Sequence, residues 1–203
     1  MHFLIRAGGT REYIDPVRFI SNASSGKMGY ALAAAAKKAG HKVTLISASD
    51  LQPPVGIDFV GVDSAAEMFA AVKKFFTKCE CLVMAAAVSD YTPAKKLKTK
   101  IQKSNRNLVV RLKPTADILK WAGGHKRKNQ IVVGFALEDK NLRRNAEKKL
   151  KEKNLDMIVA NTPAEIGCDS SAVQVKTPGQ PWLKLPRTTK VKIAERIVNL
   201  LTC

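Results

Sequence analysis

Short apolar runs alternate with amphipathic segments along this chain, which predicts strands and helices that follow one another in turn. Six apolar runs have the length of buried strands, and they cover residues 2–7, 42–47, 57–62, 81–86, 131–136 and 157–160. Apolar residues at helical spacing mark five further segments, which cover residues 28–39, 65–76, 117–122, 142–153 and 188–201. This alternation favours a parallel, doubly wound sheet with right-handed crossovers. The predicted fold class is therefore α/β, with a Rossmann-like and mostly parallel sheet.

The alternation is interrupted in three places. Residues 11–25 are polar and irregular, and residues 90–112 lack helical periodicity and are rich in Lys and Arg. We expect the second of these segments to be a strap or flap that protrudes from the sheet, with one short strand at 109–112. Residues 172–176 and 182–185, joined by a Pro-Gly turn, predict a late β-hairpin. Because no repeat or low-complexity linker divides the chain, we expect one domain over residues 1–203, with the strap inside it.

Composition agrees with a soluble enzyme that has a substantial core. The chain has 203 residues, 45% of them apolar, a length at which roughly 70% of the unfolded surface is buried on folding. The four cysteines are not spaced like a disulfide framework or a typical zinc site. No stretch reaches the ~20 apolar residues of a membrane span, and no signal peptide is evident. The expected location is the cytoplasm.

A formal net charge of +18 raises the question of nucleic acid as a partner. Many of the basic residues lie in helical or helix-flanking runs, such as residues 148–153. Aromatic residues make up only 6% of the chain, and they are not interleaved with basic ones as in proteins that stack single-stranded bases. The pattern therefore favours a solvated basic surface that attracts anionic substrates, with nucleic-acid binding kept as an alternative.

Candidate chemistry lies where predicted parallel strands end, because ligands bind at that edge of such sheets. After the first strand come Gly8-Gly9-Thr10 and then the segment SSGKMG at residues 24–29, which leads into a helix. Small residues permit close backbone approach, and the N–H groups of a helix N-terminus favour anions. The spacing matches neither the dinucleotide fingerprint nor the Walker loop. We therefore predict a phosphate-binding segment between Ala7 and Gly29 that differs from both the dinucleotide fingerprint and the Walker loop.

Other strand ends add polar and aromatic candidates. Asp90 follows the small residues of AAAVSDYTP, and Phe135 lies in VVGFALE. Lys149 and Lys153 are four residues apart and share a helix face. Taken singly, these residues are better explained without a ligand: Asp90 as a turn or cap residue, Phe135 as a core residue and the lysines as solvated ones.

The motifs taken together resemble those of one family. They are GGTREYIDPVRFISNASSGKMG, AAAVSDYTP, KTKIQK, KPTADIL, VVGFALE and KKLKEKNLDMIVAN, in this order and over nearly the whole chain. They resemble bacterial phosphopantothenoylcysteine synthetase, the ligase half of the bifunctional coenzyme A protein, here without its decarboxylase half. The segment RFISNASSGKMG is the most specific of them.

The resemblance implies a ligase that joins 4′-phosphopantothenate to L-cysteine. In this family the carboxylate attacks the α-phosphate of CTP, an acyl-cytidylate forms, and pyrophosphate leaves; the amine of cysteine then displaces CMP. The resemblance also implies Mg²⁺ with the nucleotide and a homodimer with the strap folded over the active site. It is compatible with a decarboxylase on a separate chain. ATP in place of CTP remains open.

The resemblance also assigns roles to residues. Asn22 and Lys100 correspond to groups needed for the chemistry, Arg18 and Asn22 to groups that face phosphopantothenate and the acyl-cytidylate, and Asp90 to a residue at the nucleotide or its metal. The nucleotide-binding positions implied are Gly8, Gly9, Thr10, Ser24, Ser25, Gly26, Met28, Gly29, Ala86, Asp90, Thr115, Ala116, Asp117, Ile118, Phe135, Lys149 and Lys153.

Five positions depart from the family pattern. Arg6 replaces a usual threonine, Tyr13 a proline, Ser89 an alanine, Gln102 a lysine and Ala116 a proline. None of these changes removes a group expected to act in the chemistry, although they bear on nucleotide affinity or choice.

The alternative from the same fold class is an NAD(P)-dependent oxidoreductase. Such an enzyme predicts G-x-G-x-x-G after the first strand and an acidic residue at the end of the second. The glycine fingerprint is absent, and the second strand ends in Ser47-Ala48-Ser49, with Asp50 one residue further on. A basic nucleic-acid-binding module is the alternative from another class.

Overall fold

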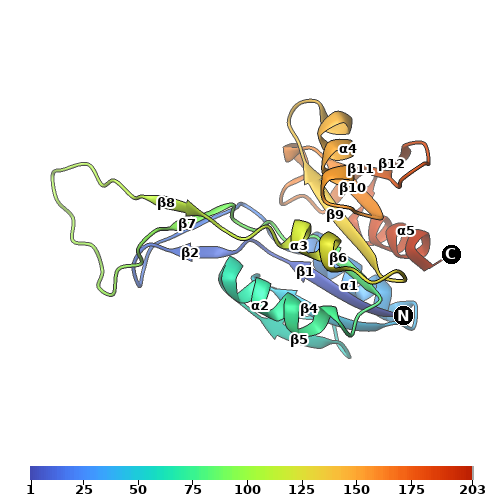
Figure 1. Ribbon diagram of the computed structural model, residues 1–203, viewed down its shortest axis with the longest axis horizontal. Coiled ribbons are helices and arrows are strands. Elements are labelled where there is room, and N and C mark those ends of the chain that lie inside the picture. The colour runs from blue at the N-terminus through green and yellow to red at the C-terminus, as the bar shows by residue number, and fades with distance from the viewer. Residues whose placement is uncertain (203) are drawn as a thin grey trace.

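The computed structural model describes residues 1–202, and an eight-stranded sheet with helices on both faces forms its frame (Figure 1). The first six strands in spatial order run parallel, in the order β5-β4-β1-β6-β9-β10. They are β5 Asp58–Gly61, β4 Lys42–Ser47, β1 His2–Ala7, β6 Cys81–Met84, β9 Ile131–Leu137 and β10 Met157–Asn161. This is the strand order of a Rossmann-like fold, so the predicted fold class is confirmed.

The late hairpin extends the sheet at one edge. Strand β11 (Ser170–Lys176) pairs antiparallel with β10, and β12 (Leu183–Thr189) pairs antiparallel with β11. The hairpin was predicted, although both strands are longer than expected. Helix α5 (Lys190–Thr202) follows at once, and the backbone N–H of Lys192 donates to Oγ1 of Thr189, as expected for a threonine at a helix start.

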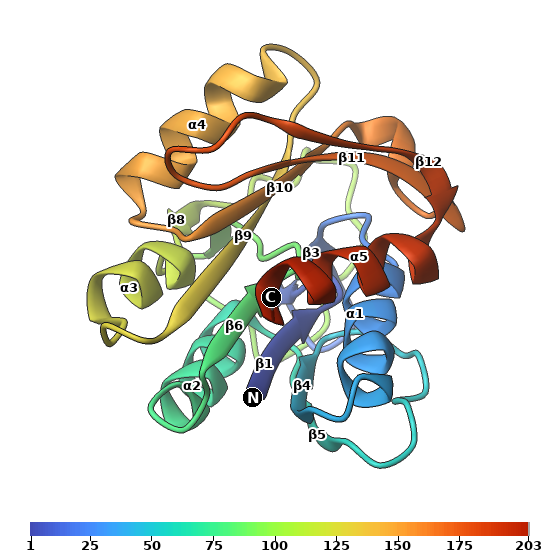
Figure 2. The ribbon, with the colours of Figure 1, turned by 90° about the vertical axis from the view of Figure 1, so that its right-hand side faces the viewer.

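Helices cover both faces of the sheet, as Figure 2 shows nearly end-on. Helix α1 (Lys27–Lys38) and α5 pack on one face, and α2 (Ala65–Phe76), α3 (Ile118–His125) and α4 (Leu142–Glu152) pack on the other. Along β1, Phe3 and Ile5 join the core on the α1 side, whereas Leu4 joins the core on the α2 side. Apolar residues on both faces of a strand are what a doubly covered parallel sheet requires.

The crevice of this sheet lies between its two central strands. β1 pairs with β4 on one side and with β6 on the other, so the chain builds the sheet outward in both directions from β1. The loops after β1 and β6 therefore diverge at their carboxyl ends and leave room there for a ligand. An isolated parallel bridge between Gly9 and Ala87 continues the pairing just past both strands.

Two antiparallel strand pairs form an arm that projects from the body, to the left in Figure 1. We call residues 11–21 and 91–114 the arm. Its strands are β2 (Arg11–Tyr13) with β3 (Phe19–Ser21), and β7 (Tyr91–Pro93) with β8 (Leu112–Pro114). The expected irregular course of residues 11–25 was wrong in this respect, because residues 11–13 and 19–21 are strands.

The strand expected at residues 109–112 was also misplaced. Leu112 begins β8, but residues 109–111 are not part of a strand, and the side chain of Val109 is 82% exposed. Val109, the first residue of the segment in which a strand was expected, therefore lies on the surface of the arm.

Asp15 ties the two halves of the arm together. Its carboxylate is buried and accepts hydrogen bonds from the backbone N–H groups of Val17, Arg18 and Ile101, and from Nη1 of Arg18. Burial alone would raise the pKa of Asp15, but the hydrogen bonds from Ile101, Val17 and Arg18 hold that pKa well below its ordinary value. The tether is therefore intact at neutral pH.

Within residues 1–202, no helix combines the length and apolar character needed to cross a membrane. The described cysteines are free thiols, with Cys79 and Cys81 buried and Cys168 exposed. Cys203 lies outside the described residues.

Candidate active site

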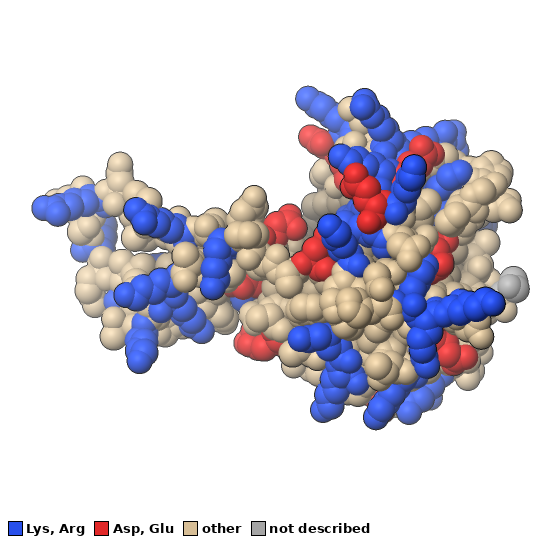
Figure 3. Space-filling view, in the orientation of Figure 1, with Lys and Arg blue, Asp and Glu red and all other residues tan. Residues whose placement is uncertain are grey.

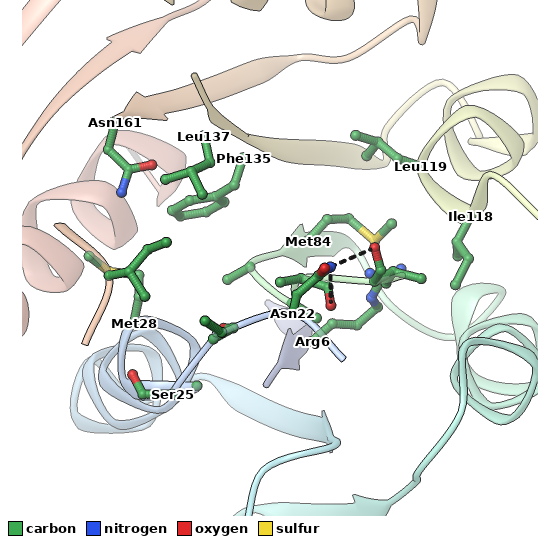
Figure 4. A pocket seen from close by; sticks show the side chains of 18 of the residues that line it. Arg6, Asn22, Ser25, Met28, Met84, Ile118, Leu119, Phe135, Leu137 and Asn161 are labelled. Carbon is green, nitrogen blue, oxygen red and sulfur yellow. Dashed lines mark hydrogen bonds between the residues drawn. The ribbon is translucent and has the colours of Figure 1, made fainter. Parts of the chain in front are cut away.

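A cavity of about 560 Å³ opens at the carboxyl ends of the parallel strands, where the switch between β1 and β6 predicted it (Figure 4). Fourteen of the residues implied by the sequence line it. They are Asn22, Ser24, Ser25, Gly26, Met28, Ala86, Asp90, Thr115, Ala116, Asp117, Ile118, Phe135, Lys149 and Lys153. Residues from five separate segments of the sequence thus meet around one space, large enough for a nucleotide.

Four implied nucleotide-binding residues, by contrast, do not line the cavity. Gly8, Gly9 and Thr10 are buried in the turn after β1, and Gly29 is buried in α1. The backbone N–H of Ala87 donates to the carbonyl of Gly8 at 2.9 Å. A Cβ on Gly9 would lie 2.6 Å from the carbonyl oxygen of Asn22. These residues support the cavity wall from behind, and direct contact with a nucleotide remains a prediction.

The start of α1 has the features of an anion site. Its N-cap, Gly26, has φ of 78°, a left-handed conformation that favours glycine, and it has no side chain to satisfy the first N–H groups of the helix. Gly29 brings the first turn against β1, since a Cβ there would lie 2.5 Å from Cβ of Ala7. The helix N-terminus therefore sits close to the sheet edge and faces the cavity.

The side chain of Asn22 is anchored at the cavity by its amide nitrogen. Nδ2 donates to the carbonyl of Ala87 at 3.3 Å and to that of Val88 at 3.2 Å, and Figure 4 draws both bonds. With both hydrogens of Nδ2 engaged, the amide oxygen remains as an acceptor, and contact between Nδ2 and a ligand oxygen requires one of these bonds to be exchanged.

Asp90 lies at the junction between the body and the arm. Its backbone carbonyl accepts from the N–H of Thr115 at 2.9 Å, and Oγ1 of Thr115 donates to the carbonyl of Ser89 at 2.6 Å. Buried Thr10 joins this junction, because its Oγ1 accepts from the N–H of Ser89 at 3.0 Å. Strand ends far apart in the sequence are thereby fixed together, and the carboxylate of Asp90 is left exposed at the cavity.

The donor set at Asp90 suits a metal ion that arrives with phosphates. Among residues 1–202, no three His, Cys, Asp or Glu side chains converge as a complete metal site. Mg²⁺ commonly binds through one or two carboxylates together with substrate phosphates, so a single exposed carboxylate at a cavity for a nucleotide fits it.

Two lysines turn toward the cavity, one in the last turn of α4 and one at its C-cap. Lys149 and Lys153 are half-buried, whereas Lys148 and Lys151 on the same segment are exposed. Nζ of Lys149 donates to the carbonyl of Phe135 at 2.9 Å, and Nζ of Lys153 forms an ion pair with Asp117 at 2.8 Å. The structure therefore separates the two predicted lysines from their solvated neighbours.

Burial and mutual repulsion weaken the proton affinity of one of these lysines. Desolvation, followed by the charge of Lys153, lowers the pKa of Lys149 from its ordinary value, while nearby carboxylates oppose the shift. Burial alone would raise the pKa of Asp117, but the hydrogen bond from Lys153 and that from the N–H of Lys120 lower it below its ordinary value. Asp117 is thus ionised, and it caps α3 and pairs with Lys153 at the same time.

Phe135 forms the apolar side of the cavity. Its ring lies opposite Met28 and beside Leu137 in Figure 4, and its side chain is partly buried against the core. The arrangement provides a flat face across from the start of α1.

The remaining two implied residues, Arg18 and Lys100, lie on the arm. Nη1 of Arg18 contacts Oδ2 of Asp15 at 2.5 Å, and Lys100 directly precedes Ile101, whose N–H also donates to Asp15. Neither lines the cavity of its own chain. Asp15 thus gathers them at one place on the arm, apart from the other fourteen residues.

The arm has the composition of a surface for an anionic and partly apolar partner. Residues 91–114 contain no Asp or Glu, and they contain eight basic residues: Lys95, Lys96, Lys98, Lys100, Lys103, Arg106, Arg111 and Lys113. Large apolar side chains are also exposed along the arm: Val17, Phe19, Tyr91, Leu97, Leu108, Val109 and Leu112.

Several cavity residues were not foreseen as site residues. Glu165 and Lys190 are buried on the side of the hairpin, and Nζ of Lys190 donates to the carbonyl of Glu165 at 3.4 Å. Arg6, noted only as a departure from the family pattern, lies in the cavity wall. The short 3-10 helix that carries Glu165, Pro163–Glu165, gives no signal in the sequence, but an arginine in an otherwise apolar strand does.

The charge distribution argues against a nucleic-acid-binding module, and the motifs argue against an NAD(P)-dependent oxidoreductase. In Figure 3 the Lys and Arg side chains are spread over the body and the arm on the face drawn. They lack interleaved aromatic residues of the kind that stack bases. The turn after β1 lacks the dinucleotide fingerprint, and β4 ends in Ser47 without an acidic residue for a ribose.

Comparisons with known proteins point to one family. A model of the DNA/pantothenate metabolism flavoprotein C-terminal domain matches residues 1–202. The bifunctional coenzyme A biosynthesis protein CoaBC of Bacillus subtilis is 42% identical over 98% of this chain and 50% of its own length. The same protein of Borreliella burgdorferi is 39% identical over 98% of the chain and 51% of its own length. The chain therefore spans about half the length of these curated relatives.

Solved structures agree with this result. The crystal structure of the C-terminal domain of CoaBC matches with a TM-score of 0.85 and 39% identity, over 98% of this chain and 93% of that one. A Cab2 H337A variant in complex with phosphopantothenate-cysteine shares the fold, with a TM-score of 0.82 at 18% identity, over 98% of this chain and 85% of that one. The resemblance drawn from the sequence motifs is confirmed.

Proposed function

Because the chain belongs to the family of the DNA/pantothenate metabolism flavoprotein C-terminal domain, we propose that it is a phosphopantothenate–cysteine ligase. It joins 4′-phosphopantothenate to L-cysteine with CTP as co-substrate, in the biosynthesis of coenzyme A. The observation that carries this proposal is the convergence of Asn22, Asp90, Lys149 and Lys153 on one cavity at the switch between β1 and β6.

The first step activates the carboxylate of phosphopantothenate. A carboxylate oxygen attacks the α-phosphorus of CTP, the bond to the β,γ-phosphates breaks, and acyl-cytidylate and pyrophosphate result. The departing phosphates carry the negative charge, and the lysines of α4 and the N-terminus of α1 are placed to stabilise it. Asp90 would hold a Mg²⁺ ion that arrives with the phosphates, and the ion would supply further charge neutralisation.

The second step forms the amide. The amine of cysteine attacks the acyl carbon, the bond to the phosphate oxygen breaks, the nitrogen loses a proton, and CMP leaves. The amide oxygen of Asn22 accepts a hydrogen bond from the incoming amine and orients it, because its Nδ2 is held by the carbonyls of Ala87 and Val88. The rigid anchoring of Asn22 positions that acceptor beside the acyl group.

We propose further that the enzyme acts as a homodimer in which the arm of one copy completes the cavity of the other. The support is that Arg18 and Lys100 lie on the arm, outside the cavity of their own chain. Exposed apolar side chains such as Phe19 and Leu108 on the same arm supply the contact surface that a second copy would bury.

Turnover tests the function. Purified protein with Mg²⁺, 4′-phosphopantothenate and CTP should release pyrophosphate, and addition of cysteine should yield CMP and the cysteine amide. The same assay with ATP measures nucleotide choice, and the Bacillus subtilis relative serves as a positive control. Absence of pyrophosphate with either nucleotide, under conditions where the control is active, would refute the proposal.

Asn22→Asp tests the division into two steps. The carboxylate cannot donate to the carbonyls of Ala87 and Val88, and its charge opposes the neighbouring phosphate. We expect pyrophosphate release to continue for about one equivalent, while amide formation falls by roughly 100-fold and acyl-cytidylate accumulates. Quenched-flow analysis of the intermediates measures both steps, and wild-type amide formation would exclude this role for Asn22.

A further inference from the structure

Arg6 is a charged side chain enclosed in the body of the protein. It lies near the carboxyl end of β1, opposite Met84 of β6, and only 2% of it is exposed. It is one of the largest fully buried side chains, and it lines the cavity beneath Asn22 (Figure 4). A strand position between two covered faces is normally apolar, as Leu4 and Ile5 are.

The guanidinium lacks partners in the part of the chain that the structure describes. Nε and Nη1 of Arg6 are both buried, and neither has a hydrogen-bond acceptor there. Burial lowers the pKa of Arg6 to about 9, and the charge of Asp117 opposes the shift. Arg6 therefore remains protonated at neutral pH. Asp117 acts on it only at a distance, because that carboxylate is paired with Lys153 and the N–H of Lys120.

Such a group opposes folding of the empty protein. A buried donor without an acceptor loses the hydrogen bonds it made to water, and an unpaired buried charge loses more. An apolar side chain of similar length would avoid this cost at the same position. Packing alone therefore gives no reason for an arginine here, whereas a ligand that supplies the acceptors does.

The missing partner of Arg6 must accept hydrogen bonds from its guanidinium and compensate its positive charge. A neutral carbonyl would accept a hydrogen bond but leave the positive charge uncompensated. A phosphate oxygen supplies acceptor and charge together, and guanidinium groups bind phosphates particularly well. The other cations of the cavity wall, Lys149 and Lys153, are also partly buried around the same space, which adds to its preference for an anion.

We propose that Arg6 is a phosphate-binding residue, which donates from the wall of the cavity to an oxygen of a phosphate group held there. Assignment of that phosphate to the nucleotide rests on the proposed function, whereas phosphate binding itself does not. The nucleotide and phosphopantothenate are the two sources of a phosphate, and separate titrations distinguish them.

The test compares Arg6→Met with wild type by calorimetric titration of inorganic pyrophosphate, CTP, 4′-phosphopantothenate and cytidine. We expect the variant to bind pyrophosphate and CTP at least about tenfold more weakly, with cytidine unchanged. A loss confined to phosphopantothenate would assign Arg6 to the phosphate of that substrate instead. Arg144→Met, which removes an exposed arginine from α4 outside the cavity, controls for net charge. Wild-type binding of all three phosphates by Arg6→Met would overturn the proposal.

Thermal unfolding separates ligand binding from a structural role. Without ligand, Arg6→Met should unfold at the same temperature as wild type or a higher one, and pyrophosphate should raise that temperature less than in wild type. A lower unfolding temperature combined with an undiminished pyrophosphate effect would show that Arg6 is structural.

A measurement on the wild-type protein avoids dependence on how Arg6→Met folds. The Nε–H signal of Arg6 in ¹H–¹⁵N NMR, assigned with Arg6→Lys, should shift on saturation with pyrophosphate, and an unmoved signal would overturn the proposal. Because the titrations need no turnover, their outcome is independent of the ligase assay. Arg6-dependent pyrophosphate binding without ligase activity would leave this proposal standing and remove the proposed function.

Discussion

The cavity wall and the arm differ in how their residues are held. In the wall, Asn22, Thr115 and Lys149 are fixed by hydrogen bonds to backbone carbonyls of the loop after β6 and of β9. On the arm, most charged and apolar side chains are exposed. The buried carboxylate of Asp15 links the two halves, as does the hydrogen bond from the N–H of Leu97 to the carbonyl of Ile14. The wall therefore has the rigidity of a binding site, whereas the arm has the exposure of an element that binds elsewhere.

This difference assigns nucleotide binding to the cavity wall and a part of the first chemical step to the arm. The implied nucleotide-binding residues that line the cavity belong to one chain and one rigid frame, so we expect each copy to bind nucleotide without help. Lys100 and Arg18 lie outside that frame, so we expect the first chemical step to depend on where the arm is placed. Variants in the two regions should accordingly change different kinetic quantities.

Lys100→Gln should have the largest effect. Removal of a cation that stabilises the charge of the first transition state is expected to slow pyrophosphate release by roughly 100-fold or more, with the affinity for CTP nearly unchanged. Rapid-quench measurement of the pyrophosphate burst and calorimetry with CTP give the two values. Lys103→Gln, also on the exposed part of the arm, is the matched control and should behave like wild type. A normal pyrophosphate burst in Lys100→Gln would contradict a role of the arm in the first chemical step.

Lys149→Met should change the affinity for CTP, the quantity that Lys100→Gln leaves nearly unchanged. Loss of a half-buried lysine from the cavity should weaken CTP binding by about 10- to 100-fold, because a charge-assisted contact is removed. Lys148→Met, on the exposed side of the same helix, should weaken it by less than about threefold. Equal effects of the two substitutions would show that the lysines act only through net charge.

The pH dependence of CTP binding should identify Lys149 as well. Its pKa is lowered by burial and by Lys153, and only its protonated form attracts phosphate. Affinity should therefore fall as pH rises through a value below the ordinary pKa of lysine. In an Arg6→Met background, which removes the other cavity cation of lowered pKa, this fall should be absent in Lys149→Met. A fall that persists in the variant would assign the titration to another group.

Asp15→Asn should have the smallest effect, confined to the arm. The lowered pKa of Asp15 means that its tether stabilises the folded arm at pH values above the ordinary aspartate pKa, and that this contribution is lost only as pH falls through the lowered value. The asparagine variant should lack this stabilisation of the arm at every pH. We expect faster hydrogen exchange at the amide of Ile101 and a few-fold slower turnover, with CTP binding unchanged. Unchanged exchange at Ile101 would show that Asp15 does not hold the arm.

The sequence predicted the body well because the body obeys simple periodicities. Buried strands such as β6, Cys81–Met84, are continuous apolar runs. The four-residue spacing of Lys149 and Lys153 was enough to predict that both face the same side at the end of α4. The strand ends then fixed where the cavity would lie, because ligand crevices in such sheets follow from the strand order.

The arm was predicted poorly because its strands are three residues long and have little buried surface. Val109 is apolar but exposed and Val110 is only half-buried, so the apolar pair indicated a strand where the chain forms none. The arm strands at residues 11–13 and 19–21 depend on pairing with each other, which local sequence does not specify. Arg6 was visible as a departure, but its burial and lack of partners required the three-dimensional structure.

Subunit mixing tests most directly whether the arm of one copy completes the cavity of another. Asn22→Asp and Lys100→Gln protomers, each nearly inactive alone, are mixed in equal amounts and allowed to exchange. If the arm acts on the partner, half of the dimers are mixed, and each has one site with both residues intact, so the mixture should regain roughly a quarter of wild-type turnover. If the arm acts on its own chain, every site carries at least one substitution, and activity that stays at the level of the separate variants would contradict the account.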